Sequence, residues 1–343
     1  MSRITIYDVA KAANVSASSV SRYLSDPGSI KPIAAMNIEK AIKELGYIPN
    51  TFAQSLKRGS NNTIGIVVPG LGPFFSRICS ALSDFFYQHK YLLFICETGD
   101  DLEKERYYIN SLIGQRVSGL LVVPSGRSSD FLLAASQQFA NMVLLDRYEA
   151  ALPLDVVCED DVEGSYRLTK AMIRQKGGGA KEKDFVLLFR TEHSTNTAQR
   201  IEGARRAFAE AGLDMEKSHL LLNHQLPQEL GPVFSKLFSQ EGRPSSVIAY
   251  SPLILENAFI VLRKLGYDIP RQVQLGGYSL DEFGTKYQMD IPRIQQDPYA
   301  LGIQAGDTLL RRMRKAGGRP LPLRQLKLEP TLLLPEELAE AGE

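Results

Sequence analysis

The chain has 343 residues, with 40 Lys and Arg against 39 Asp and Glu, and a formal net charge of +1. This length exceeds the usual size of one domain, so more than one domain is expected. The sequence has no apolar run long enough to span a membrane, and its start does not resemble a signal peptide, which argues against a membrane or exported protein.

Charge is unevenly distributed along the chain. Residues 1–60 hold eight Lys and Arg against four Asp and Glu, a net charge of +4, and the remainder has a net charge of −3. A basic excess confined to one segment is typical of a nucleic-acid-binding module. Cys79, Cys96 and Cys158 are an odd count at spacings that do not suit a metal, so we expect buried thiols in a cytoplasmic protein.

Two short helices joined by a tight turn are predicted between residues 5 and 26. Thr5 and Asp8 have the spacing of a capping box for the first helix, and Asn14 stands where the turn needs a left-handed residue. Ser16 is expected to cap the second helix. The outer face of that helix is then free for the major groove of DNA, which is the layout of a helix-turn-helix.

A third helix follows, because Ile38, Ala41, Ile42 and Leu45 repeat at helical spacing before Gly46. The alternative interpretation of these three helices is a small amphipathic bundle with no role in DNA binding. The turn, the caps and the outward polar face favour the DNA-binding interpretation.

The run YIPNTFAQSL predicts a short helix of about two turns. Asn50, Ala53 and Leu56 lie on one side of it, and Lys57 follows at once. A helix this short is marginal alone in water, so it is expected to fold against a partner. Leu56 suits a wedge between DNA bases and Lys57 suits a phosphate contact.

Residues 3–60 resemble the headpiece of the LacI/GalR family of bacterial transcription regulators, through ITIYDVAKAANVS, SVSRYLSD, AIKELGYIPN and AQSLKRG. The resemblance implies a homodimer on double-stranded operator DNA, with recognition helices in the major groove and paired hinge helices in the minor groove. Four residues would contact bases, namely Ala17, Ser18, Arg22 and Leu56. Six would contact the DNA backbone, namely Thr5, Ser16, Ser19, Ser21, Asn50 and Lys57.

Two features of this headpiece bear on affinity and specificity. Arg22 is the one base-contacting candidate that can make a bidentate contact to guanine. The family usually opens its third helix with a Thr–Arg pair, whereas this chain has Ala34 and Ala35 there. A phosphate contact is therefore expected to be missing.

Beyond residue 62 the pattern changes to short apolar runs that alternate with helix-length amphipathic segments. The runs are TIGIVV, YLLFICE, GLLVVP, MVLLD, DFVLLFR, HLLL, SVIAYS and QLGG. Apolar strands separated by helices indicate parallel sheets covered on both faces, and eight or nine strands fit two doubly wound subdomains. The region resembles the periplasmic-binding-protein fold that the family carries as its sensor.

The expected fold is therefore an α-helical helix-turn-helix headpiece followed by an α/β sensor with two subdomains and parallel sheets. The expected boundaries are 1–48 for the headpiece, 49–61 for the hinge and 62–343 for the effector-binding and dimerisation domain. Within the sensor, residues of about 62–160 and 292–324 form the N-subdomain, and residues of about 161–291 and 325–343 form the C-subdomain. The tail has no heptad run that would indicate tetramerisation.

Ligands in such folds bind beyond the carboxyl ends of the strands. Nine candidates stand at or after these ends, namely Phe74, Phe75, Ser125, Asp146, Arg147, Arg200, Ser251, Ser279 and Asp281. The two phenylalanines suit either ring stacking on a ligand or core packing.

The charged candidates also have two interpretations each. Asp146 and Arg147 form either a ligand clamp or a surface salt bridge, and the clamp is favoured. Arg200 matches an arginine that reaches the effector in the family, although it would also suit a solvated helix face. Asp160 and Asp161 are as suited to capping the next helix as to touching a ligand.

Two departures from the family bear on the effector. Ser251 and Pro252 stand where many members have Asn–Asp, and Ser279 stands where many have a sugar-binding Asp. Either Asp281 replaces that carboxylate or it is lost. With Arg147 and Arg200 retained, we expect an anionic effector, such as a 2-keto-gluconate or gluconate derivative. A phosphorylated sugar and a regulator without a ligand are the alternatives.

No enzyme signature is present in the sequence. The histidines at 89, 193, 219 and 224 lack Cys or carboxylate partners at ligand spacing, and GLGPFF at 70–75 does not fit a phosphate-binding loop. We therefore expect no catalytic residue, metal or cofactor. The sequence predicts a repressor of carbohydrate or sugar-acid catabolism genes under allosteric control. A solute-binding or sugar-modifying protein with an appended helical module is the alternative from another class.

Overall fold

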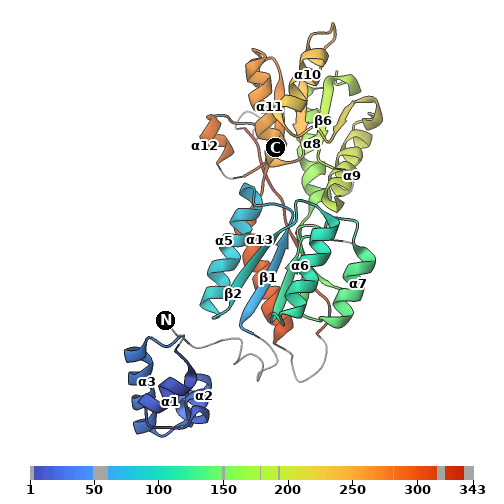
Figure 1. Ribbon diagram of the computed structural model, residues 1–343. Coiled ribbons are helices and arrows are strands. Elements are labelled where there is room, and N and C mark those ends of the chain that lie inside the picture. Colours follow the sequence, from blue (N-terminus) through green and yellow to red (C-terminus); the bar gives the residue numbers. More distant parts are fainter. Residues whose placement is uncertain are drawn as a thin grey trace. The chain divides into compact units, whose positions relative to one another are not determined.

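The computed structural model describes residues 4–48, 61–148, 151–177, 179–191, 194–280, 282–314 and 321–335. The chain divides into two compact units: Met1–Thr63 with Gly114–Ser118, and Ile64–Ile113 with Gly119–Glu343. The first unit contains the N-terminal helices, and the second contains two β-sheets and the helices that cover them (Figure 1).

The N-terminal helices are α1 (Ile6–Ala12), α2 (Ala17–Ser25), the 3-10 turn η1 (Pro27–Ser29) and α3 (Pro32–Leu45). They enclose a small core, made by Val9, Ala10, Ala13, Val20, Ile38, Ala41 and Tyr47. This is the predicted three-helix arrangement. The predicted hinge helix lies outside the described residues, and so do Asn50, Leu56 and Lys57.

The second unit contains two six-stranded sheets, ordered β11-β5-β4-β3-β1-β2 and β12-β10-β9-β8-β6-β7. The strands of the first sheet are β1 (Thr63–Val68), β2 (Leu92–Glu97), β3 (Gly119–Val122), β4 (Met142–Leu145), β5 (Asp155–Glu159) and β11 (Gln325–Leu328). The strands of the second are β6 (Phe185–Phe189), β7 (His219–Leu222), β8 (Ser246–Ala249), β9 (Gln274–Ser279), β10 (Arg293–Gln295) and β12 (Thr331–Leu333). The sheets are parallel through their centres, as predicted, and β12 pairs antiparallel with β10.

Strand β6 shows why the strands of this unit appear in the sequence as unbroken runs of apolar residues. Val186 and Leu188 point into a core with β8 and α11, whereas Phe185, Leu187 and Phe189 point into a second core with α8 and α9. All five side chains are buried. A strand covered on both faces needs apolar residues at every position, so the alternation expected of a half-exposed strand is absent.

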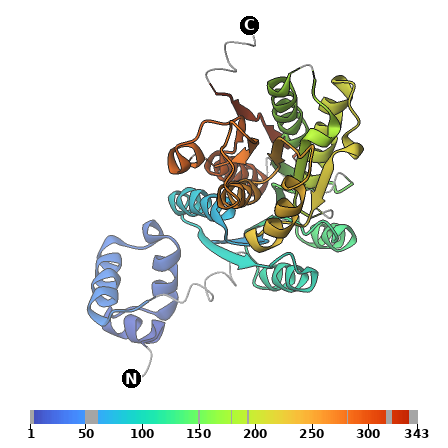
Figure 2. The same cartoon turned by 90° about the horizontal axis from the view of Figure 1, so that it is seen from above.

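Helices follow most strands and cover both sheets. Those associated with the first sheet are α5 (Pro73–Gln88), α6 (Leu102–Gly114), α7 (Ser129–Gln138) and α13 (Pro298–Met313). Those associated with the second are α8 (Asp161–Lys176), η2 (Glu182–Asp184), α9 (Thr195–Glu210), η3 (Met215–Lys217), α10 (Pro227–Phe238), α11 (Pro252–Lys264) and α12 (Phe283–Tyr287). Helix α13 packs beside α5, although the two helices lie far apart in the sequence (Figures 1 and 2). None of the described helices combines the length and the apolar character that crossing a membrane requires.

Strand pairing corrects two of the expected subdomain boundaries. β10 (Arg293–Gln295) pairs with β9 of the second sheet. The second segment of the N-subdomain, expected to begin at 292, therefore begins only after β10. β11 pairs with β5 of the first sheet, so the expected switch at 325 is also too early. Within the described residues the chain passes between the sheets after β5, after β10 and after β11. Strands β10, β11 and β12 have only three or four residues and are only partly buried, so they lack the unbroken apolar run that identifies the central strands in the sequence.

Candidate functional site

The helix-turn-helix is fixed by the caps that the sequence predicts. The Thr5 backbone N–H donates to Asp8 Oδ2 at 2.8 Å, and the Thr5 hydroxyl donates to the same oxygen at 2.7 Å. These bonds, that of the side chain first, lower the pKa of Asp8. Asn14 adopts the left-handed conformation, with φ of 52°, in the turn. These local contacts set the start of α1 and the turn that precedes α2.

Helix α2 presents a polar face around its N-terminus. Ser16 Oγ accepts from the Ser19 N–H at 3.1 Å and lies 2.8 Å from Ser18 Oγ. Ser18 and Arg22 are exposed, and Ser21 is half-buried. This face is available to a nucleic acid.

Two headpiece positions differ from a uniformly polar DNA-binding surface. Ala17 is half-buried and packs against the headpiece core, so less of it faces outward than expected. The start of α3 has no side-chain cap and exposes the apolar side chains of Ile33 and Met36. Ala34 and Ala35, which stand where the family pattern has Thr–Arg, are half-buried and offer no side-chain donor to a phosphate.

A cavity of about 280 Å³ lies in the second unit, where carboxyl ends of strands from both sheets meet. Its lining comprises Pro69, Gly70, Gly72, Pro73, Phe74, Phe75, Asp100, Asp146, Arg190, Asn196, Arg200, Ser251, Pro252, Leu253, Glu256, Leu280 and Gln296. Rings, cations, carboxylates and amides converge there, which is the composition of a small-molecule site.

Five of the nine predicted ligand residues line this cavity, namely Phe74, Phe75, Asp146, Arg200 and Ser251. Ser125, Arg147 and Ser279 are buried outside its lining. Ser279 faces its own sheet, where its hydroxyl lies 3.5 Å from the Ile294 carbonyl, and Leu280 takes the lining position. Asp281 lies outside the described residues.

The two phenylalanines combine both of their expected roles. Phe75 is buried in the core of the first sheet, and Phe74 packs against that core while half-exposed. The rings meet edge to face with centroids 5.1 Å apart. The core contact of Phe75 thus holds the exposed ring of Phe74 at the cavity wall, where it can cover the apolar face of a ligand.

Arg200 is held by groups that the sequence alone did not connect with it. Its Nε donates to Asp161 Oδ1 at 2.6 Å, and its Nη1 donates to the Tyr250 carbonyl at 2.6 Å. Its guanidinium lies 4.0 Å from the centroid of the Tyr278 ring. Burial, the largest single effect, would lower the pKa of Arg200, but the charge and hydrogen bond of Asp161 together with Tyr278 and Glu159 outweigh it, and the pKa is raised. The side chain is a buried ion-pair partner rather than part of a solvated face.

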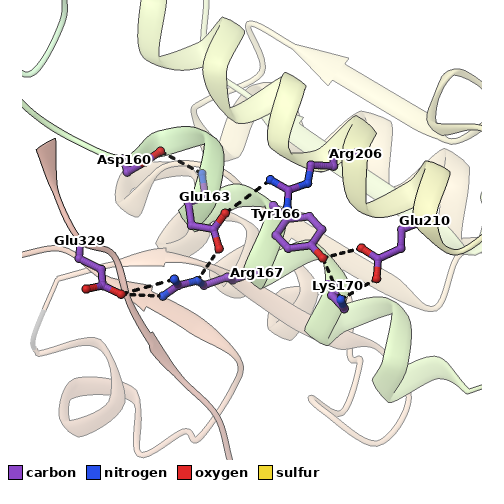
Figure 3. Close-up of polar contacts among 8 residues, drawn as sticks. All are labelled: Asp160, Glu163, Tyr166, Arg167, Lys170, Arg206, Glu210 and Glu329. Carbon is purple, nitrogen blue, oxygen red and sulfur yellow. Dashed lines mark hydrogen bonds and ion pairs between the residues drawn. The ribbon is translucent and has the colours of Figure 1, made fainter.

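The outer sides of α8 and α9 hold these two helices together (Figure 3). Arg206 lies over the Tyr166 ring, 3.9 Å from its centroid, and pairs with Glu163 at 3.6 Å. Lys170 donates to Glu210 at 2.6 Å and to the Tyr166 hydroxyl at 2.8 Å. Because Arg200 belongs to α9, this exposed network, which holds α9 against α8, helps to place its guanidinium at the cavity.

The helices also approach closely at Gly203. A Cβ at this position would lie 2.8 Å from Ser165 Cβ and would overlap the Val162 carbonyl of α8. The absence of a side chain therefore allows the close packing that positions Arg200, one turn away.

A second group of charges lies beside the cavity. Arg147, which is 3% exposed, donates to Asp100 Oδ1 at 2.6 Å. It is therefore neither the expected ligand clamp nor a surface salt bridge. Arg190 Nη2 lies 3.9 Å from Asp100 Oδ2, and its buried Nε has no hydrogen-bond partner among the described residues.

Both cavity aspartates adopt a backbone conformation that is uncommon for residues other than glycine. Asp100 has φ of 61° and Asp146 has φ of 63°. Burial raises the pKa of the Asp146 carboxyl, and the neighbouring Arg147 opposes that increase. Carboxylates held in such a conformation beside a cavity are concentrated at functional sites, and Asp146 is buried as well.

Glu159 and Asp161 lie where the chain leaves the first sheet for the second. Gln296 Nε2, at another such passage, donates to Glu159 Oε2 at 2.5 Å. Burial, and then the Asp161 carboxylate, raises the pKa of Glu159 to about 8. Burial also raises the pKa of Asp161 to about 6, against the opposing effect of Arg200. Asp160 instead caps α8, since its Oδ1 accepts from the Glu163 N–H at 3.1 Å.

Several lining residues were not among the sequence candidates. Arg190 directly follows the buried strand β6, so the rule that selected Asp146 and Arg147 would also have selected it. Gln296 follows β10, a strand that was not predicted. Asn196 joins the site through a 3.5 Å contact with Asp146, which sequence spacing does not reveal.

Comparisons with known proteins match both parts of the chain. Residues 5–50 match the model of bacterial regulatory proteins of the lacI family, and residues 61–322 match the model of periplasmic binding proteins and the sugar binding domain of the LacI family. The HTH-type transcriptional repressor PurR of Glaesserella parasuis serovar 5 is 27% identical over 92% of this chain and 92% of its own length.

Solved structures show the same fold. The lac repressor dimer bound to operator and the anti-inducer ONPF has a TM-score of 0.80, is 20% identical, and matches 97% of this chain and 98% of its own. The complex of the transcriptional regulator CelR with cellobiose has a TM-score of 0.65 and 21% identity, and matches 97% of this chain and 99% of its own.

Proposed function

Because the chain belongs to the LacI family and is a DNA-binding transcriptional repressor rather than an enzyme, we propose that a small ligand in the cavity controls its binding to DNA. The observation that carries this proposal is the cavity itself. It brings together Phe74, Arg190 and Asp146 at the carboxyl ends of strands from both sheets. A ligand that contacts both sheets can bind one arrangement of the sheets better than another, which is the requirement for allosteric control.

The DNA-binding surface is the exposed side of α2, with Ser18 and Arg22 directed at base edges. Thr5, Ser16, Ser19 and Ser21 contact the DNA backbone. The expected hinge residues Asn50, Leu56 and Lys57 complete the interface, with Leu56 as the wedge that kinks the operator. Two copies bind a palindromic site as a homodimer, because a single hinge helix is too short to be stable alone. The protein then works in the bacterial cytoplasm, where operator DNA is found.

The effector is a small anionic sugar derivative. Guanidinium and carboxylate groups both line the cavity, so it offers partners to an anion and to hydroxyl groups. A sugar acid such as gluconate or a 2-keto-gluconate derivative has both kinds of group, and the regulated genes would then serve sugar-acid catabolism. A phosphorylated sugar is the second candidate, because a phosphate group also pairs with a guanidinium.

Two measurements on the full chain test this function. Binding to duplex DNA is measured by fluorescence anisotropy at increasing salt, where a repressor shows a steep linear fall of log K with log salt concentration. A solute-binding or sugar-modifying protein with an unrelated helical module would show little affinity for duplex DNA. Operator binding is then repeated with sugars, sugar phosphates and sugar acids. A regulator controlled through the cavity changes its operator affinity with at least one of them.

A thermal-shift screen with the same compounds identifies which class binds, since a ligand that binds the native state raises the melting temperature. A shift confined to neutral sugars would contradict the anionic effector. No shift with any compound would contradict control by this class of ligand.

A further inference from the structure

Three arginines lie at or beside the cavity, and two of them are already engaged by protein groups. Arg200 donates through Nε to Asp161 and through Nη1 to the Tyr250 carbonyl. Arg147 donates to Asp100 and is outside the cavity lining. Two of the three guanidinium nitrogens of Arg200 thus already donate to protein acceptors, and Arg147 stands away from the cavity.

Arg190 combines two features that neither of the others has together. It lines the cavity, as Arg147 does not, and its Nε is unpaired among the described residues, as that of Arg200 is not; the Nε of Arg147 is also unpaired but lies outside the lining. The Arg190 side chain is 33% exposed and lines the cavity. Its Nε is buried without a hydrogen-bond partner among the described residues, and its nearest carboxylate contact is the 3.9 Å separation from Asp100. That separation is too long for a hydrogen bond. A buried N–H of a charged group left without an acceptor is costly, so the site is incomplete as it stands.

The surrounding charges explain why an anion would complete it. Burial lowers the pKa of Arg190, and the positive charge of Arg147 lowers it further. Asp100 already accepts from Arg147, so it only partly balances the Arg190 charge. An acceptor with a negative charge would satisfy the orphan Nε and reduce the repulsion among the arginines.

We propose that Arg190 is the residue that binds the anionic group of the effector and selects acids over neutral sugars. This inference rests on the proposed function, since it assigns one part of the same ligand site. The guanidinium edge formed by Nε and one Nη suits two oxygens of a carboxylate or phosphate group. The carboxylate is favoured, because Arg190 is the one cation of the described lining whose Nε is unengaged and a phosphate dianion needs more donors.

The anion at Arg190 also orients the rest of the ligand. Asp146, Asn196 and Gln296 line the same cavity and offer a carboxylate and two amides. These groups suit hydroxyls, which both donate and accept hydrogen bonds. A polyhydroxylated acid thus binds with its acid group at the end of β6 and its hydroxyls toward the end of β4.

The test compares gluconate, 2-keto-gluconate, glucose and glucose 6-phosphate as probes by isothermal titration calorimetry with the full chain. The wild type is expected to bind at least one of the two acids and to bind glucose more weakly. Arg190→Gln is expected to weaken acid binding by about tenfold or more, as lost charge-assisted hydrogen bonds do. Arg190→Lys keeps the charge without the planar edge, so it should recover part of the loss.

Arg205→Gln is the matched control. Arg205 lies on the exposed side of α9, where it pairs with Glu202 and Glu216. This variant is expected to bind the probes as the wild type does. Circular dichroism and the melting temperature without ligand show whether Arg190→Gln has folded, and the lysine variant supplies a second readout if it has not.

The outcomes separate the two proposals. If the wild type binds an acid and Arg190→Gln binds it within threefold of the wild type, the role of Arg190 is wrong and the anionic effector stands. If the wild type binds glucose 6-phosphate alone, with a loss in Arg190→Gln, the anion at Arg190 is a phosphate and the carboxylate assignment is overturned. If the wild type binds none of the four probes, the proposed effector class and the role of Arg190 are both overturned.

Discussion

Arg200 and Asp161 form a buried salt bridge of 2.6 Å between α9 and the start of α8, with side chains only 6% and 2% exposed. The two residues are 39 positions apart in sequence. Asp161 directly follows the passage from the first sheet to the second, and Arg200 lines the cavity. The salt bridge therefore connects the wall of the ligand cavity to the segment that joins the sheets.

Asp161→Asn should lower the free energy of unfolding by about 3 kcal/mol, because it leaves the Arg200 charge buried without its carboxylate. Urea denaturation followed by circular dichroism measures the change. Asp307→Asn is the control, since Asp307 is 59% exposed and lies 3.5 Å from Arg324 at the surface. It should cost less than about 1 kcal/mol. Equal losses in the two variants would contradict the importance of burial at Asp161.

Gly203→Ala should destabilise the protein by about 1–3 kcal/mol, since the added methyl group would overlap the Val162 carbonyl and crowd Ser165. Gly114→Ala makes the same change within α6, where a Cβ would meet nothing within 4 Å. That variant should gain about 0.5–1 kcal/mol from the better helix propensity of alanine. Melting temperatures with opposite signs are expected, and a stabilised Gly203→Ala would show that α8 and α9 are not closely packed there.

The stability of the protein should fall as the pH rises toward 8, in part because of Glu159. The folded state raises the pKa of this carboxyl from an ordinary value of 4.5 to about 8. Between these values the folded chain binds a proton that the unfolded chain has released, so the stabilisation is complete below pH 4.5 and is lost as the pH passes 8.

Glu159→Gln removes this titration while keeping the shape of the protonated side chain. Free energies of unfolding from urea titrations at pH 5, 6, 7 and 8 should fall less steeply than those of the wild type. The difference in slope is at most about 1.4 kcal/mol per pH unit for one proton. Asp161 and Arg200 are unchanged in both proteins, so parallel pH profiles would mean that Glu159 titrates normally.

Arg22→Ala should weaken binding to the preferred operator by about 1–3 kcal/mol and relax the preference at one base pair. The operator is first obtained by selection from random duplexes with the wild type. Lys11→Ala removes an exposed cation from α1 of the same headpiece and should affect all sequences alike. An equal loss for Arg22→Ala on operator and random DNA would assign Arg22 to the phosphate backbone instead of a base.

The headpiece could be predicted from sequence because its determinants are local. Thr5 and Asp8 are three residues apart, and the turn depends on the left-handed conformation of Asn14 itself. The central strands were equally recognisable, because burial on both faces produces unbroken apolar runs such as β6. The edge strands β11 and β12 were missed, because they are short and depend on pairing with distant segments.

The ligand site was predicted less well because its roles depend on distant partners. Arg200 was expected to bind the effector directly, and its engagement with Asp161 and Tyr250 is a tertiary contact that spacing does not encode. An Arg200→Ala variant would consequently disturb the fold as well as the cavity. Arg190 is the better candidate for direct contact with the ligand. The argument depends on its Nε, which has no hydrogen-bond partner among the described residues, and the sequence alone does not reveal this.

The last two described strands also affect how the protein is made. Only Glu329 and Pro330 separate β11, at one edge of the first sheet, from β12, at one edge of the second. Both sheets thus take an edge strand from the same short stretch of chain, although most strands of the first sheet are translated long before those of the second. A ribosome releases these two edges almost simultaneously, so neither sheet can complete its strand order before residues 325–333 have been synthesised.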